Sequence, residues 1–138
     1  MARLHRFGIS LEKSLLDKFD RLIKKENYTN RSKAFRDLIR QELVKEEWRE
    51  GKKIVGAITL IYNHHQRELL NKITDTQHNF QKLIISTQHI HLDPHNCLEI
   101  IAVRGIPKEV QKLRDTLKSI KGVKHGTLSM STTGKDIK

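Results

Sequence analysis

The chain has little cysteine and no long apolar run, and each shortage excludes a class of protein. Cys97 is the one cysteine among 138 residues, so no disulfide can form within the chain. A single thiol suits the reducing cytoplasm, where it serves packing, metal binding or chemistry. No apolar run approaches the roughly 18 residues that a membrane-spanning helix needs. The N-terminal residues also lack the apolar core and cleavage site of a signal peptide, so the sequence predicts a cytoplasmic protein.

Basic residues, in contrast, are plentiful. The net charge is +11, from 27 Lys and Arg against 16 Asp and Glu, and it favours an anionic partner, nucleic acid first. A well-solvated basic surface is the alternative explanation. Residues 1–52 carry 14 basic and 9 acidic side chains, and residues 53–138 carry 13 and 7. Because the excess is spread along the chain, charge alone does not locate the partner.

The first part of the chain predicts a strand followed by two helices. Apolar and polar residues alternate over residues 5–11, which is typical of a short half-buried strand. Apolar residues then recur at helical spacing over residues 11–28, and again from residue 31 onward. Thr29 or Asn30 can cap the second of these helices.

A lone strand needs a partner for its backbone groups, and a second copy of the chain can supply one across a two-fold axis. Such a two-stranded ribbon fits the major groove of DNA, and a helix start can hold a phosphate. This is the ribbon–helix–helix arrangement; the alternative is a helical hairpin that binds nothing. The residues expected to contact DNA are Arg6, Gly8 and Ser10 through the ribbon, and Asn30, Arg31 and Ser32 through the helix start.

The pattern changes after Gly51, which lies in a charge cluster, so residues 48–53 are expected to link two domains, residues 1–50 and residues 51–138. The sequence of the second domain predicts the element order βαββαβ, which is the ferredoxin-like split βαβ. The whole chain is therefore expected to be an α+β protein. Its strands are expected within residues 52–64, 81–92, 95–105 and 122–131, and its helices within residues 65–80 and 107–120.

The stretch "TQHIHLDPHNC" holds three histidines and the cysteine. His89 and His91 lie two residues apart on an expected strand, so their side chains leave the same face. A short hairpin loop returns the chain to Cys97 on the neighbouring strand, where the thiol can reach the same ion. Glu99 shares the face of Cys97 and can orient a ligand by hydrogen bonding. The pattern predicts an ion site with two nitrogen ligands and one sulfur ligand.

The expected fourth ligand is His78, on a predicted helix. It lies about 130° from the apolar stripe of that helix, so it is expected to face solvent or another subunit. It is then either a solvated histidine or a ligand supplied across a subunit interface. The residues leave the metal open, because tetrahedral sites favour zinc and square-planar sites favour Ni(II) or Cu(II). A nucleophilic role for Cys97 is disfavoured, since no glycine-rich turn adjoins it, and no enzyme activity is expected.

Five segments, in order and at a family's spacing, resemble the nickel-responsive transcriptional regulators, the NikR family. The segments are "RFGISL", "NRSKAFRDLIR", "TQHNF", "TQHIHLDPHNCLEI" and "GVKHG". They span nearly the whole chain. The combination of His-x-His, five residues, Cys-Leu-Glu and an upstream Thr-Gln-His is specific.

The resemblance implies a ribbon–helix–helix dimer joined to an ACT-like domain that assembles into a homotetramer, a dimer of dimers. It implies one Ni(II) per subunit, in a square-planar site at the tetramer interface, and nickel-dependent operator binding that represses nickel-uptake genes. The implied residues are His89, His91 and Cys97 from one subunit, His78 from another, and Tyr62, His64 and Glu99 in the surrounding network.

Two positions depart from the family's pattern. Gly8 stands where the family often has a threonine that reads bases, so the operator preference is open. Lys33 stands where an acidic residue often helps to hold a cation between the domains, although its companion Asp37 is present. That cation is then either absent or replaced by the lysine.

A nickel-sensing repressor is the leading hypothesis. One alternative is a nickel storage or delivery protein without DNA-linked regulation, which would show no salt-dependent duplex affinity. Another is a regulator whose ACT-like domain binds a small organic effector.

Overall fold

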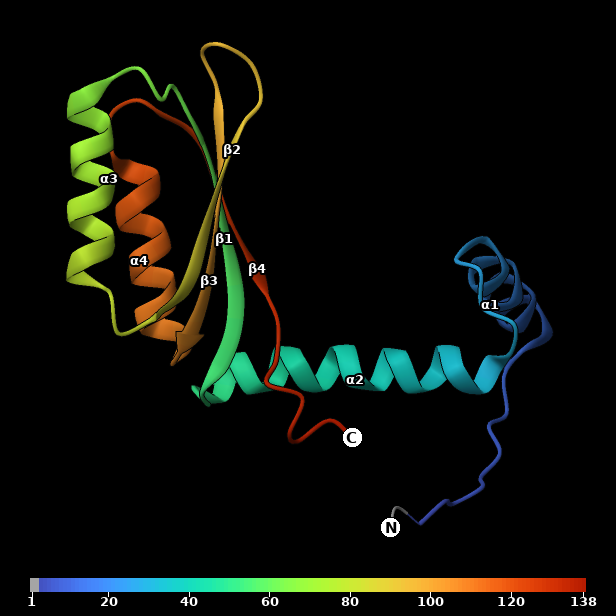
Figure 1. The fold of residues 1–138 in the computed structure, drawn as a ribbon. Helices are drawn as coiled ribbons and strands as arrows, with labels where there is room; N and C mark the ends of the chain where they lie inside the picture. The colour runs from blue at the N-terminus through green and yellow to red at the C-terminus, as the bar shows by residue number, and fades with distance from the viewer. Residues whose placement is uncertain (1–2) are drawn as a thin grey trace. The chain divides into compact units, whose positions relative to one another are not determined.

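The computed structural model describes residues 3–138 (Figure 1). Contacts divide the chain into two compact units, one ending at Gln41 and one spanning Glu42–Lys138. The division falls inside the helix α2 (Arg31–Glu50). No helix in the described part of the chain is long and apolar enough to cross a membrane.

The first unit is built from two helices joined by a tight turn. α1 (Lys13–Lys25) is followed by Asn27, whose positive φ of 67° is a conformation that asparagine tolerates better than most residues. The Asn30 side chain accepts a hydrogen bond of 2.9 Å from the amide of Lys33. Asn30 therefore caps the start of α2, as the sequence predicts.

Residues 3–12 form neither helix nor strand, so the strand expected at residues 5–11 is absent from the single chain. The physical reason is that a strand needs a second backbone for its hydrogen bonds, and a single chain with this order of elements does not supply one. The ring of Phe7 lies 5.8 Å from that of Phe35, yet Phe7 remains 72% exposed. Pairing of this segment with a second chain stays a prediction.

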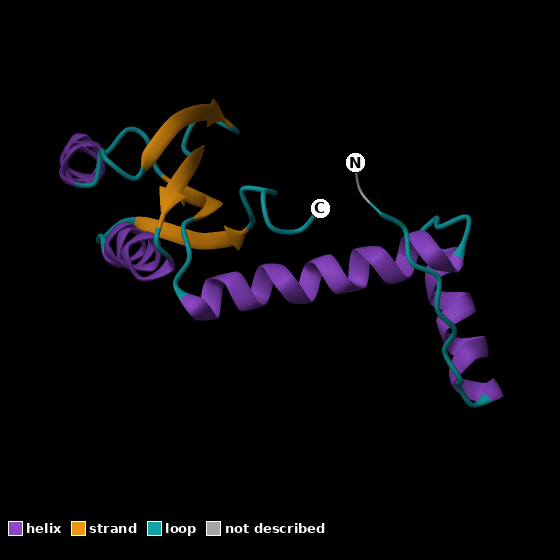
Figure 2. Cartoon of the chain, turned by 90° about the horizontal axis from the view of Figure 1, so that it is seen from below, coloured by secondary structure: helices purple, strands orange, loops and turns teal. Residues whose placement is uncertain are grey.

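The second unit contains a four-stranded antiparallel sheet with two helices packed on one face (Figures 1 and 2). The strand order β2-β3-β1-β4 confirms the ferredoxin-like prediction. The elements are β1 (Ile54–Tyr62), α3 (Arg67–Asn79), β2 (Ile84–His91), β3 (Cys97–Gly105), α4 (Pro107–Ser119) and β4 (Val123–Met130).

Alternating burial along the two central strands defines the core. The side chains that face α3 and α4 are buried, whereas those on the opposite face are only half-buried. The fully buried set includes Ile54, Ile58, Leu60, Ile101, Val103, Val110, Leu113 and Leu117. The half-buried set includes Val55, Ala57, Ile61, Leu98, Ile100 and Ala102. One sheet face is thus a core, and the other is an apolar surface that no helix of this unit covers.

Trp48, near the end of α2, belongs to this core. Its side chain is 7% exposed, and its indole nitrogen donates a hydrogen bond of 2.8 Å to the carbonyl of Ser131. The expectation that residues 48–53 form a linker is therefore wrong at Trp48. Burial of the large indole ring stabilises the folded chain, so Trp48 packs into the core. The connection to β1 is confined to the residues between Glu50 and Ile54.

Candidate metal centre

The strand register brings the predicted ligands of the hairpin into two neighbouring rows. His91 pairs with Cys97, and His89 pairs with Glu99, across β2 and β3. Tyr62 pairs with Cys97 from the other side, across β1 and β3. Directly opposed residues share a face of the sheet, and Cys97 and Glu99 are buried on the face that carries the helices. Two imidazoles, one thiol and one carboxyl therefore gather on that face at the end of the sheet.

Glu99 is the centre of a buried hydrogen-bond network. Its side chain is 0% exposed, and it accepts hydrogen bonds from Tyr62 at 2.7 Å and from the Gln77 amide nitrogen. The Nε2 atom of His89 lies 3.1 Å from the same carboxylate, while its Nδ1 lies 3.4 Å from the Tyr62 hydroxyl. Both ring nitrogens of His89 are thus near protein partners, so the imidazole ring must rotate away from at least one of them before His89 can bind an ion.

Burial is the main cause that raises the pKa of Tyr62, followed by the hydrogen bond to Glu99. Its hydroxyl therefore stays protonated and acts as a donor to Glu99 across the working pH range. The family resemblance implies both Tyr62 and Glu99 in this network, whereas Gln77 was not predicted. The available clue was the position of Gln77 beside His78 on α3, on the side of the helix nearer the sheet.

His64 is an aromatic neighbour of His91, one of the predicted ligands. Its ring stacks on that of His91 with centroids 4.3 Å apart and planes within 2°. Desolvation is the first cause that lowers the pKa of His64, and the neighbouring His65 is the second. The Nδ1 atom of His64 is buried without a hydrogen-bond partner. A neutral, stacked imidazole fits a role in holding the ring of His91.

His78 is exposed on α3, as its place off the apolar stripe predicts. Within the described residues, no group of three or more His, Cys, Asp and Glu side chains is placed to hold an ion. His89 and His91 are exposed, whereas Cys97 is only 1% exposed. One chain thus places three donors at one end of the sheet without closing a site, and imidazole and thiolate donors fit Ni(II), Cu(II) and Zn(II) alike.

Comparisons with known proteins identify the family. Residues 55–131 match the NikR C-terminal nickel-binding domain, and residues 5–46 match the ribbon-helix-helix proteins of the copG family. The chain belongs to the nickel-responsive regulator family. A relative in Syntrophus aciditrophicus, named "Putative nickel-responsive regulator", is 62% identical over 97% of this chain and 98% of its own. A relative of the same name in Chlorobium limicola is 60% identical over 97% of this chain and 100% of its own.

A solved structure supports the fold of this regulator. An uncharacterized protein from Thermotoga maritima aligns with a TM-score of 0.51 and 14% identity, over 56% of this chain and 95% of its own. At that identity the likeness concerns the fold alone.

The residues that the regulator is expected to present to DNA lie in the first unit. Arg6, Gly8 and Ser10 are exposed in the segment before α1. The Arg31 guanidinium pairs with the carboxylate of Asp20 through two hydrogen bonds, of 2.9 and 2.8 Å. This pairing lowers the pKa of Asp20, and it commits the Arg31 side chain to Asp20.

Lys33, one of the two positions expected to depart from the family's pattern, is also paired. The Lys33 ammonium lies 2.6 Å from Asp37, which also accepts a hydrogen bond of 2.7 Å from Tyr28. The hydrogen bond from Lys33, then that from Tyr28, lowers the pKa of Asp37. The lysine thus supplies a positive charge to the companion carboxylate from within the chain.

Proposed function

We propose that this regulator is a nickel-sensing transcriptional repressor that acts in the cytoplasm, without enzymatic activity. The observation that carries the proposal is the pair of cross-strand rows, His91 with Cys97 and His89 with Glu99, in a nickel-binding domain joined to a ribbon-helix-helix domain. We propose that residues 1–50 form the DNA-binding domain and residues 51–138 the metal-binding domain, with Trp48 at the end of α2 packed into the core of the second unit.

One Ni(II) per subunit is the proposed ion, held by His89, His91 and Cys97 of one subunit and His78 of another. The exposure of His78 on the outer side of α3 supports a ligand role toward a second chain. Tyr62 and Glu99 would orient His89, and His64 would hold His91 by stacking. Bound nickel would link two subunits, and only one arrangement of the subunits would bring all four ligands to the ion. Because nickel would bind that arrangement more tightly than any other, it would shift the population toward it.

A homotetramer, a dimer of dimers, is the proposed assembly. The uncovered sheet face is apolar and half-buried in one chain, and apolar surface of this kind is typical of subunit interfaces. The first unit likewise exposes Phe7, Ile9 and Leu11 along the segment predicted to pair with a second chain. Paired segments would present Arg6, Gly8 and Ser10 to operator DNA, with the backbone near Asn30, Arg31 and Ser32 on a phosphate.

Titration with Ni(II), followed by absorbance, tests the metal site. A thiolate-to-nickel charge-transfer band should appear and saturate at one ion per subunit, and it should be lost in Cys97→Ala. The matched control is His95→Ala, because His95 is an exposed histidine of the same hairpin loop. No band in the unaltered protein, or an unchanged band in Cys97→Ala, would remove the site. Because the thiol must lose a proton to bind, nickel affinity should fall as the pH drops.

A nickel storage or delivery protein would bind the same ion without altering DNA binding. Duplex binding measured with and without nickel separates the two functions. A repressor binds operator DNA more tightly when nickel is present, and equal affinity would leave storage or delivery. A response to an organic effector that persists in His89→Ala would point to an effector-binding regulator instead.

A further inference from the structure

The C-terminal end of α2 belongs to the second unit, and contacts that lie apart from the candidate metal centre hold it there. The Glu47 carboxyl, 6% exposed, accepts a hydrogen bond of 2.9 Å from the hydroxyl of Thr132. Trp48 donates to the carbonyl of Ser131, whose own amide donates 2.9 Å to the carbonyl of Val55. These bonds join the end of α2, the start of β1 and the segment after β4.

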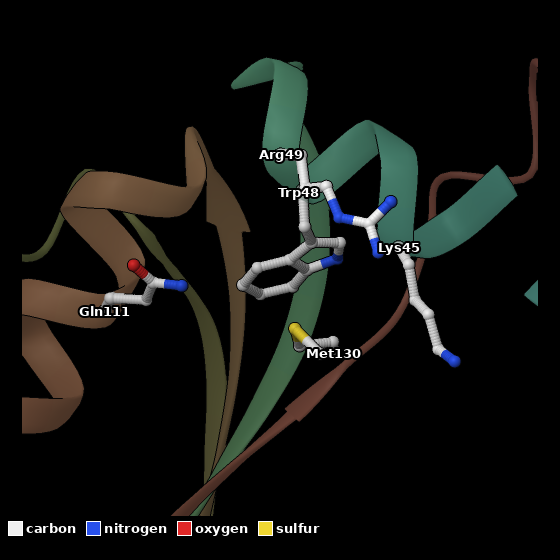
Figure 3. Close-up of a pocket in the computed structure, with 5 residues that line it drawn as sticks. All are labelled: Lys45, Trp48, Arg49, Gln111 and Met130. Atoms are coloured by element: carbon white, nitrogen blue, oxygen red, sulfur yellow. The ribbon is translucent and has the colours of Figure 1, made fainter. Parts of the chain in front are cut away.

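Packing around the indole strengthens this attachment. Figure 3 shows Trp48 extending from α2 toward Met130, with Gln111 of α4 nearby. A Cβ atom at Gly56 would lie 3.5 Å from the indole and 2.9 Å from the carbonyl of Ser129. Glycine at this position therefore allows β1, β4 and the indole to approach closely.

The connection from α2 to β1 is itself ordered by a helix-ending motif. Gly51 adopts a φ of 74°, and the amide of Lys52 donates a hydrogen bond of 3.2 Å to the carbonyl of Glu47. This pairing is that of a Schellman motif, in which a left-handed glycine closes the last helical turn. Only Lys53 then separates the motif from β1, so the connection has little freedom to act as a joint.

We propose that Glu47, Trp48 and Thr132 are positioning residues, which fix the last turns of α2 to the metal-binding unit. A change in that unit then reaches the DNA-reading unit through α2 and is not absorbed at Gly51. The proposal rests on the proposed function, in which nickel in one unit alters operator binding by the other. Coupling between two sites requires an element whose state both sites bias, and α2, which runs from one unit into the other, is the element we propose.

Thr132 offers a selective test, because its hydroxyl is the donor to a buried carboxyl and its neighbour is a threonine. Thr132→Val keeps the side-chain shape and removes both the donor to Glu47 and the acceptor of the Gly134 amide, whereas Thr132→Ser keeps the hydroxyl. The matched control is Thr133→Val, since the Thr133 hydroxyl accepts a hydrogen bond from the amide of Lys135 and is not bonded to Glu47.

The first readout is the fluorescence of Trp48, the one tryptophan of the chain. In the nickel-free, full-length protein, acrylamide should quench Trp48 more strongly in Thr132→Val than in the unaltered chain. Thr132→Ser and Thr133→Val should match the unaltered chain. Equal quenching in all four proteins would overturn the positioning role.

The second readout is the ratio of operator affinities with and without Ni(II). Loss of one hydrogen bond to the buried carboxyl should lower this ratio about tenfold in Thr132→Val, with nickel affinity unchanged, while Thr132→Ser retains the full ratio. An undiminished ratio in Thr132→Val would overturn the inference. A ratio of one in the unaltered protein would instead refute the proposed function, and with it the coupling role, whereas the quenching comparison would still report whether α2 is held.

Discussion

Two tyrosine–carboxylate hydrogen bonds of equal length allow the effect of burial to be measured within one chain. Tyr62 donates to Glu99 at 2.7 Å inside the second unit, and Tyr28 donates to Asp37 at 2.7 Å near the surface of the first. Tyr62 and Glu99 are each 0% exposed. In Tyr62→Phe, the Glu99 carboxyl loses a donor at a place where water cannot replace it.

A hydrogen bond to a charged group contributes about 2 kcal/mol to stability when its loss leaves the partner buried. For a unit of this size, such a loss corresponds to a decrease of roughly 10 °C in the unfolding temperature. Tyr28→Phe should change the stability little, because water can replace the lost donor to Asp37. Thermal unfolding of the nickel-free proteins, followed by circular dichroism, makes the comparison. Equal losses in the two variants, or no loss in Tyr62→Phe, would refute the reasoning from desolvation.

Three further predictions concern other parts of the molecule. Lys33→Met should raise the pKa of Asp37 toward its ordinary 3.8. A carboxyl pKa that is lower in the folded state stabilises that state at pH values above the ordinary pKa, and this stabilisation is lost as the pH falls through the pKa of the folded state. The variant should therefore be less stable than the unaltered chain near neutral pH and no less stable in strong acid. NMR titration of Asp37 and urea unfolding at both pH values check this. Gln77→Ala should weaken nickel binding by removing a donor to Glu99, as calorimetry would show, and an unchanged affinity would deny the network a role. Leu113→Ala should cost about 2–5 kcal/mol of unfolding free energy, because the side chain is fully buried; a loss below about 1 kcal/mol in urea unfolding would contradict the described core.

The second unit follows closely from sequence periodicity, because its core is made within one chain. The sequence predicts strands within residues 52–64 and 95–105, and β1 and β3 lie there, each with alternating buried and half-buried or exposed residues. Pro107 predicts a helix start, and α4 begins there. The burial of Trp48 could not be read from a charged, glycine-containing stretch, because it depends on contacts with Ser131, 83 residues further on.

The first unit shows the limit of reasoning from periodicity. Residues 5–11 alternate as a strand does, but one chain offers them no partner backbone. The candidate metal centre is only partly predictable from the sequence, again because one chain does not supply all of the contacts. The register that opposes His91 to Cys97 follows from a short hairpin, whereas the contribution of His78 depends on a second chain. Gln77 was not predicted, because its hydrogen bond to Glu99 depends on how α3 packs over Glu99.

The most direct test of a nickel sensor is fluorescence anisotropy of a labelled duplex, selected by the protein from a random-sequence pool, at one fixed salt concentration. Fixed salt is essential because phosphate contacts make the affinity depend steeply on ionic strength. We predict that one equivalent of Ni(II) per subunit lowers the dissociation constant at least tenfold, and that Cys97→Ala abolishes this gain while the nickel-free affinity is kept. The same dissociation constant with and without Ni(II) would contradict the central claim.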